Sequence, residues 1–238
     1  IPFLEREIAP RLKGRTFESF REAAVEFDSL EIEGRRLHTA IRYGLSQAFL
    51  DGVARSSRRL MAEVVAEEYG LPLVAERVPI FAQSGDDRYN NVDKIILKGA
   101  DVLPHALINA VDGKLGRHGQ DLLEYVGWLT RRIQELRPDP TYQPDLHIDV
   151  YGTIGLIFDH DPERIAGYLA TLEEAARPFR LYLEGPVDMG ERGRQMEVLG
   201  QIRRAVEARG SQVRIVADEW CNTHEDVVAF TDCACCHM

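Results

Sequence analysis

Long apolar runs are missing from the sequence. The longest, residues 150–158, is far shorter than the roughly 20 residues that a membrane-spanning helix needs. The first ten residues, IPFLEREIAP, carry charges where a signal peptide has its apolar region, so we expect no signal peptide. The basic cluster that would hold a chain to an anionic bilayer is also missing. We therefore expect no association with a membrane.

Cysteine is scarce as well, and basic residues are outnumbered by acidic ones. The four cysteines, Cys221, Cys233, Cys235 and Cys236, crowd the carboxyl-terminal end and do not form a disulfide framework, so we expect a protein of the reducing cytoplasm. Lysine and arginine number 29 against 39 aspartates and glutamates, which gives a net charge of −10. Such a chain repels the phosphates of nucleic acids, and we expect no nucleic-acid partner.

Common nucleotide and hydrolase motifs are absent. The sequence contains neither a Gly-rich phosphate loop nor a Gly-x-Ser-x-Gly segment. With 45% hydrophobic and 29% charged residues among 238, the composition is that of a globular protein. Because the chain starts at Ile1 rather than Met, we expect a fragment of a longer protein.

Residues 1–77 show a helical pattern. Apolar residues recur every four positions from Leu37 to Val53, and the pattern resumes at Leu60, which keeps them on one helix face. Gly70, with Pro72 just beyond it, predicts the end of the helical region. We expect residues 1–77 to form a mostly helical domain.

From residue 78 onward, strand-like and helix-like segments alternate. Apolar stripes predict helices, for example over 122–136 and after the cap formed by Asp161 and Pro162. Short runs rich in β-branched residues predict five strands, at 78–83, 92–98, 146–151, 179–184 and 213–218. This alternation predicts an α/β fold with a parallel sheet. Five strands are too few to close an eight-stranded (β/α)8 barrel. We therefore expect an incomplete barrel, with exposed strand edges at 78–83 and 213–218.

Three of the predicted strands end in a carboxylate. Asp149, Glu184 and Asp218 lie 35 and 34 residues apart, about the length of one βα unit of a (β/α)8 barrel. In such a barrel the carboxyl ends of the strands meet on one face, where three carboxylates repel one another unless a cation lies between them. All-oxygen ligation suits Mg²⁺ best and Mn²⁺ next. Ordinary loop caps are the alternative reading.

Other polar residues lie near these strands. His105, in an Leu-Pro-His turn, is a candidate acid or base, and Gln83 is a candidate hydrogen-bond donor to a substrate carboxylate. Lys98 is a candidate base from the second strand, although a structural ion pair explains it better. The terminal Cys-Ala-Cys-Cys-His has no second ligand pair, and we interpret it as core or loop rather than as a metal site.

The segments KIILKGADVLPHALIN, LHIDVYGTIGLIFD, LYLEGPVD and VADEWCNT, and nearly the whole chain around them, resemble methylaspartate ammonia-lyase (3-methylaspartase), a family of the enolase superfamily. The resemblance implies a carbon–nitrogen lyase that eliminates ammonia from 3-methylaspartate to give mesaconate in glutamate catabolism. It also implies a partial TIM-type (β/α)8 barrel over 78–238, preceded by the helical rear of an enolase-type capping domain over 1–77. A homodimer with a small amino-acid substrate follows from the same resemblance.

Residue by residue, the resemblance assigns the Mg²⁺ ligands to Asp149, Glu184 and Asp218, the catalytic histidine to His105 and a substrate-binding glutamine to Gln83. It allows Mn²⁺ as a substitute and a monovalent cation such as K⁺. In the family, the His-Met pair is followed by a Gln-x-Lys segment that carries the main base. The present sequence does not contain that lysine, so we expect almost no activity on the epimer that depends on it.

Two alternatives stay open. Another enolase-type reaction, such as racemisation or cycloisomerisation, uses the same metal scaffold, and fold analogy alone does not separate these reactions. The chain is otherwise a non-catalytic metal-binding or structural fragment, which the missing lysine favours.

Overall fold

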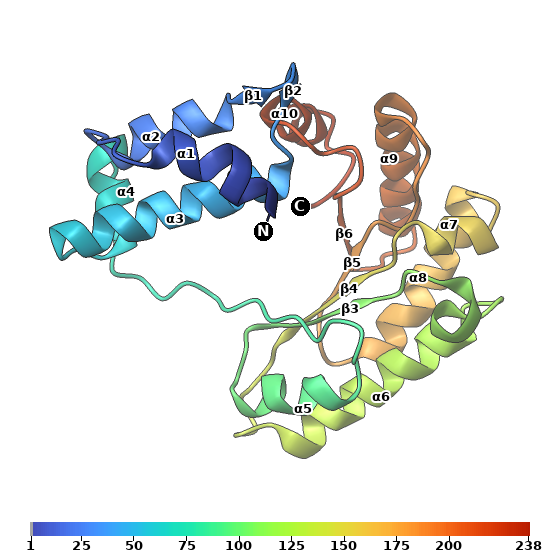
Figure 1. Cartoon of the computed structure of the whole chain (residues 1–238). Helices are drawn as coiled ribbons and strands as arrows, with labels where there is room; N and C mark the ends of the chain where they lie inside the picture. The colour runs from blue at the N-terminus through green and yellow to red at the C-terminus, as the bar shows by residue number, and fades with distance from the viewer. Residues whose placement is uncertain (1) are drawn as a thin grey trace. The chain divides into compact units, whose positions relative to one another are not determined.

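The computed structural model describes residues 2–238, and the chain divides into two compact units, Ile1–Arg77 and Val78–Met238 (Figure 1). Residues 71–80 form neither helix nor strand, and every one of them is exposed. The division falls where the sequence pattern changes. The assignment of the first unit to the rear of a capping domain stays a prediction.

The first unit is mainly helical. Its elements are a π-helical turn η1 (Leu4–Ile8), α1 (Ala9–Leu12), α2 (Phe20–Asp28), a hairpin of β1 (Glu31–Ile32) and β2 (Arg35–Arg36), α3 (Thr39–Ser57) and α4 (Met61–Tyr69). Gly70 ends α4 in the left-handed conformation, as the sequence predicts. The long helical region is interrupted, because Arg58 takes up a left-handed conformation after α3. Phe20, Leu50 and Val64 hold α2, α3 and α4 together.

The second unit contains a four-stranded parallel sheet. The strands follow chain order: β3 (Val102–Leu107), β4 (Asp145–Asp149), β5 (Leu181–Glu184) and β6 (Arg214–Val216). The helices are α5 (Asn90–Leu97), α6 (Gln120–Leu136), α7 (Thr153–Ile157), α8 (Pro162–Ala176), α9 (Arg192–Ala208) and α10 (His224–Asp232), with an irregular turn η2 (Val111–Leu115). This arrangement confirms the predicted α/β fold.

The main helices of this unit form a single layer. Contacts run from α5 to α6, from α6 to α8 and from α8 to α9, in the same order as the strands (Figure 1). In a doubly wound fold, successive helices alternate between the two faces of the sheet, whereas a barrel places all of them outside. Sequential strands with one layer of helices are therefore the arrangement of a partial (β/α)8 barrel.

The core lies between the sheet and these helices, because each helix presents an apolar stripe. The predicted stripe of α6 is buried at Leu122, Val126, Leu129 and Ile133. Burial of each such side chain stabilises the fold by about 1.5–3 kcal/mol. Asp161 caps α8 as predicted and accepts hydrogen bonds from the next two backbone N–H groups beyond Pro162. The same core includes Leu146, Ile148, Leu181, Leu183 and Ile215 from the sheet and Ile165, Leu169, Leu199 and Ile202 from the helices.

Two predicted strands are wrong. Residues 92–98 lie in α5 and its cap, where Val92 and Ile96 are buried one helical turn apart. The strand of this region is β3, which contains the Leu-Pro-His segment that the sequence suggested was a turn. Residues 78–83 are not a regular strand either. Two isolated parallel bridges, Phe81 to Val102 and Gly85 to Ala106, join residues 81–85 to the edge of β3 that faces away from β4.

The opposite edge of the sheet is not bare, contrary to expectation. His237 donates its backbone N–H to the carbonyl of Ile215, and Met238 accepts from the N–H of Ala217. The carboxyl-terminal residues thus cover part of the outer edge of β6.

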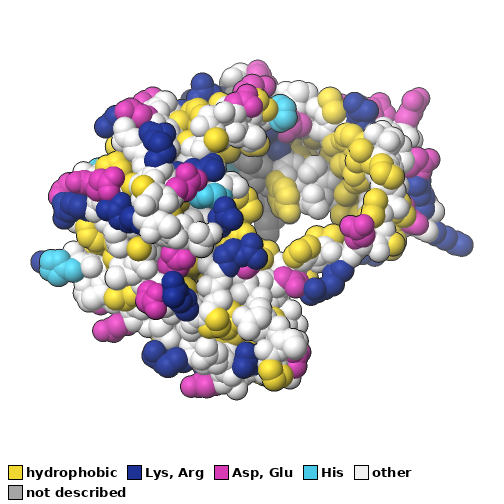
Figure 2. Space-filling model, turned by 180° about the vertical axis from the view of Figure 1, so that it is seen from behind, with side chains coloured by type: hydrophobic (Ala, Val, Ile, Leu, Met, Phe, Trp, Pro, Cys, Tyr) yellow, Lys and Arg dark blue, Asp and Glu magenta, His cyan; other side chains and the backbone are white. Residues whose placement is uncertain are grey.

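The surface carries charged side chains of both signs, as 29% charged residues lead one to expect. On the face shown in Figure 2, acidic and basic side chains are interspersed. Among residues 2–238, no helix combines the length and apolar character that crossing a bilayer requires.

Candidate functional site

Acidic residues gather at the carboxyl ends of the strands in the second unit. Asp149 ends β4 and Glu184 ends β5, and the two are register partners on these neighbouring parallel strands. Their side chains are only 5% and 13% exposed. Asp218 follows β6 by two residues and is exposed. The sheet therefore brings two buried carboxylates together and places a third just beyond them.

A bulge in β3 directs His105 towards these acids. Pro104 pairs with His147 and Ala106 with Ile148, so His105 is an extra residue without a partner on β4. Its backbone is left-handed, with φ of 46°. The imidazole Nε2 lies 3.2 Å from Glu184 Oε2 and 4.0 Å from Asp149 Oδ2.

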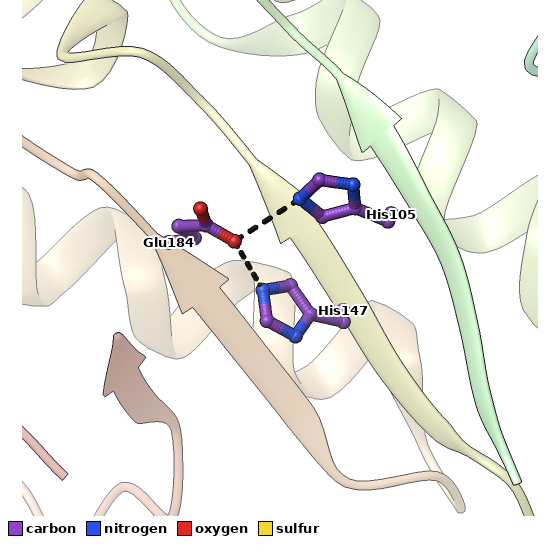
Figure 3. Close-up of side chains that lie close together, drawn as sticks. All are labelled: His105, His147 and Glu184. Carbon is purple, nitrogen blue, oxygen red and sulfur yellow. Dashed lines mark hydrogen bonds and ion pairs between the residues drawn. The ribbon is translucent and has the colours of Figure 1, made fainter. Parts of the chain in front are cut away.

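His147 completes the cluster (Figure 3). It lies on β4 two residues before Asp149, and side chains two apart on a strand share a face. Its Nε2 donates to Glu184 Oε2 over 2.6 Å, so both histidines bind the same oxygen. One nitrogen from each histidine and one oxygen from Glu184 lie within 4.8 Å of one another.

Aromatic rings pack around the histidines. The ring of Phe81 lies 5.2 Å from that of His105 and 5.0 Å from that of His147, between centroids. Tyr182 stacks on His147 from the other side. Gln83 is exposed and lies two residues beyond Phe81, between the bridges that join this segment to β3. The placement of the Gln83 side chain at the site stays a prediction.

Hydrogen bonding stabilises opposite charges on His105 and Glu184. The bond to Glu184 raises the pKa of His105, burial opposes this rise, and the charges of Glu184, Asp149 and Asp218 add to it. Burial alone would raise the pKa of Glu184, but hydrogen bonds from His105 and His147 outweigh it and lower that pKa to about 2. Glu184 is therefore an anion at neutral pH.

Asp149 and Glu219 have the opposite electrostatic environment. Burial, followed by the charge of Glu184, raises the pKa of Asp149 to about 6. Burial and the charges of Asp149, Asp218 and Asp188 raise the pKa of Glu219 to about 7. Within residues 2–238, no hydrogen-bond partner reaches the buried Oε2 of Glu219. The site thus holds more acidic groups than the chain's own positive charges offset.

These residues fit a hard divalent cation. Asp149, Glu184 and Asp218 offer carboxylate oxygens, which Mg²⁺ and Mn²⁺ prefer. A cation between them would offset both the burial and the charge of Glu184, which together raise the pKa of Asp149. The tightest group of potential ligands in residues 2–238 is, however, His105, His147 and Glu184 rather than the three acids. The three-carboxylate ligand set stays a proposal.

Sequence reasoning missed His147 and Glu219. Each has a sequence signal, because His147 precedes Asp149 by two positions on the same strand and Glu219 adjoins Asp218. Neither signal separates a site residue from an ordinary core or loop residue without the structure.

The other sequence candidates lie away from the acids. Lys98 follows α5 and precedes β3, so it lies towards the amino ends of the strands rather than the carboxyl ends. Cys235 is buried in the core, as expected. The structure joins it to Cys233 in a disulfide, which the sequence did not predict but which links no separate elements.

Comparison with known families gives a match over both units. A model of the amino-terminal part of methylaspartate ammonia-lyases matches residues 1–70, and a model of the carboxyl-terminal part matches residues 72–238. Methylaspartate ammonia-lyase 2 of Carboxydothermus hydrogenoformans is 59% identical over 239 aligned residues, which cover 100% of this chain and 57% of that protein. The Citrobacter amalonaticus enzyme is 58% identical, and 58% of its length is covered.

Solved structures agree. A crystal structure of the Citrobacter amalonaticus methylaspartate ammonia-lyase containing (2S,3S)-3-methylaspartic acid matches with a TM-score of 0.89. The match covers 100% of this chain and 58% of the chain in that structure. The Mg complex of β-methylaspartase from Clostridium tetanomorphum is 55% identical, has a TM-score of 0.85 and covers 100% and 57%. The present chain thus spans somewhat more than half the length of these relatives.

Proposed function

Since this chain belongs to the methylaspartate ammonia-lyase family, we propose that it carries the metal-binding face of an enzyme that eliminates ammonia from 3-methylaspartate to give mesaconate in glutamate catabolism. The observation that carries the proposal is the meeting of Asp149, Glu184 and His105 at one end of the sheet. On family resemblance we also propose a cytoplasmic homodimer that accepts Mn²⁺ in place of Mg²⁺ and uses a monovalent cation such as K⁺.

The chemistry requires positive charge beside a substrate carboxylate. The proton next to the distal carboxylate of 3-methylaspartate is weakly acidic, and its removal builds further negative charge on that carboxylate. Asp149, Glu184 and Asp218 would hold Mg²⁺, which would supply the positive charge that offsets this build-up. The strand ends fix these acids before substrate arrives, so little reorganisation is needed.

The remaining residues move or orient protons. His105 is partly buried, and its Nε2 faces both acids, so we assign it to proton transfer at substrate C3. Gln83 is exposed between the two bridges to β3, and we assign its amide to hydrogen bonding with a substrate carboxylate. The ring of Phe81 packs against both imidazoles and limits their orientations.

The test measures ammonia release and mesaconate absorbance from threo- and erythro-3-methylaspartate with Mg²⁺. The present chain is compared with a longer chain that carries its natural downstream sequence. We expect Mg²⁺ binding by both chains, elimination by the longer chain, and almost none by the present chain on the lysine-dependent epimer. His105→Asn in the longer chain should change the ratio of rates on the two epimers, whereas the exposed His118→Asn should not.

Asn is a suitable replacement at position 105, because it tolerates the left-handed backbone found there. A folded, Mg²⁺-binding longer chain that eliminates nothing would favour another enolase-type reaction. Absence of Mg²⁺ binding in both chains would contradict the metal site itself.

A further inference from the structure

His147 is more buried than either of the other residues in its cluster. Its side chain is 4% exposed, against 14% for His105 and 13% for Glu184. We propose that His147 is a positioning residue that holds Glu184 with one carboxylate oxygen turned towards the metal. The inference rests on the proposed Mg²⁺ site and adds a residue to it.

The hydrogen bond gives His147 this role. Its Nε2 lies 2.6 Å from Glu184 Oε2, and an ionised carboxylate only accepts hydrogen bonds, so Nε2 carries the proton. In Figure 3 the second oxygen of Glu184 points away from both imidazoles. Oε2 is therefore fixed by histidine, and Oε1 is left for a cation.

Packing keeps the donor in place. The ring of His147 meets Phe81 edge-on, with an angle of 84° between planes, and lies nearly parallel to Tyr182, at 15°. In the sheet, His147 pairs with Tyr182 and Asp149 pairs with Glu184. His147 thus lies two residues before Asp149 on the same face of the sheet, between the rings of Phe81 and Tyr182.

The second nitrogen argues against His147 as a metal ligand. Metal-ligating histidines almost always donate their other N–H to an acceptor, which fixes the ring. Among residues 2–238, no partner reaches Nδ1 of His147, which is buried. A neutral ring that donates from Nε2 leaves only a lone pair unpaired at Nδ1, whereas ligation through Nε2 would leave a buried N–H unpaired.

The two histidines divide the work. His105 binds the same oxygen at 3.2 Å, a longer contact, and proton transfer requires it to be free to engage substrate. His147 lies deeper and keeps Glu184 oriented whether or not His105 is engaged.

The test uses two variants of the present chain, residues 1–238. His147→Phe keeps an aromatic ring for Phe81 and Tyr182 but removes the donor, and His147→Gln keeps a donor without the ring. We expect His147→Phe to weaken Mg²⁺ binding about 10–100-fold in calorimetric titration, as loss of a ligand's hydrogen-bond partner does. His147→Gln should restore most of the affinity, and the exposed His118→Phe should match the parent chain.

The outcomes are distinct. Unchanged Mg²⁺ affinity in a folded His147→Phe variant, or equal damage in both variants, would overturn the positioning role. Nitrogen coupling from His147 to bound Mn²⁺ in electron spin-echo spectra would make it a ligand and would also overturn the role. If the parent chain binds no Mg²⁺, the proposed metal site fails, and the inference fails with it.

Discussion

Asp149 and Glu184 lie side by side but have different local partners. Glu184 accepts hydrogen bonds from two imidazoles, whereas Asp149 accepts one from the backbone N–H of Tyr151, and its nearest imidazole nitrogen is 4.0 Å away. The two hydrogen bonds lower the pKa of Glu184 to about 2, whereas burial and the charge of Glu184 raise the pKa of Asp149 to about 6. Of these two acids, Asp149 is thus the one that a nearby cation would stabilise more.

Replacement of Asp149 tests this electrostatic imbalance. With divalent cations removed at pH 8, Asp149→Asn should raise the free energy of unfolding by roughly 1–3 kcal/mol, because it removes a buried charge that repels Glu184. Added Mg²⁺ should stabilise the parent chain but not the variant. Thermal melts with chelator and with Mg²⁺ measure both effects.

The control is Asp112→Asn, at a side chain that is 84% exposed. It should leave both melts unchanged. A parent chain that is as stable without a cation as Asp149→Asn, and indifferent to Mg²⁺, would contradict the argument.

At this scale the sequence predicts residues that end strands better than residues within them. Asp149, Glu184 and Asp218 stand out because three acids follow apolar runs at spacings of 35 and 34 residues, about one βα unit each. His147 does not, because a histidine inside an apolar strand is as typical of a core as of a site. Its partner, Glu184, is 37 residues away, and only the register of β4 and β5 brings the two together.

Individual elements show where local patterns fail. Residues 92–98 are rich in β-branched residues and yet form a helix, because Val92 and Ile96 bury one face and Arg132 of α6 binds Asp93. Tertiary packing overrides strand propensity here. The strand β3 was missed because Pro104 normally marks a turn, and the bulge that accommodates it is not visible in sequence.

Helix caps are predicted more reliably, and the capping box of α10 allows a test of pH dependence. Asp226 binds Arg192 and accepts from the backbone N–H groups of Asn222 and Thr223. The Arg192 bond and these cap bonds outweigh desolvation and lower the pKa of Asp226 from 3.8 to about 2. A carboxyl with a lowered pKa stabilises the fold above its unfolded pKa, and this stabilisation is lost as pH falls through the folded value.

Asp226→Asn should therefore melt at a lower temperature than the parent chain from pH 4 upward. The difference should shrink between pH 4 and pH 2, because acid protonates the parent carboxyl as well. Melting curves over this pH series measure the gap, with the exposed Asp232→Asn as control. A gap that is constant down to pH 2 would show that the charge of Asp226 is not what stabilises α10.

For the whole molecule, the sequence predicted the α/β class and the change at residue 78, because periodicity is a property of long segments. The sequence did not predict that the carboxyl-terminal residues hydrogen-bond to the outer edge of β6. The contacts of His237 and Met238 with Ile215 and Ala217 depend on the path of the chain after α10.

The arrangement in two units predicts a proteolytic pattern. Residues 71–80 are exposed and without regular structure, so a protease of broad specificity should cut there first. All of the proposed site residues, from Gln83 to Asp218, belong to the second unit, Val78–Met238. The larger fragment should therefore bind Mg²⁺ as tightly as the uncut chain, which mass spectrometry and calorimetry can establish. Cleavage within 81–238 before cleavage within 71–80, or a loss of Mg²⁺ affinity after cleavage, would contradict this prediction.

The bulge in β3 has a consequence for how this site can change over time. His105 is the one residue of its strand without a partner on β4, while Leu103 and Ala106 on either side remain fully buried in the core. A substitution at position 105 that tolerates the left-handed backbone should therefore leave sheet pairing and core packing intact. If His105 has the proposed role, selection can adjust the chemistry at this position separately from the fold, and a search for a new reaction would begin with substitutions there.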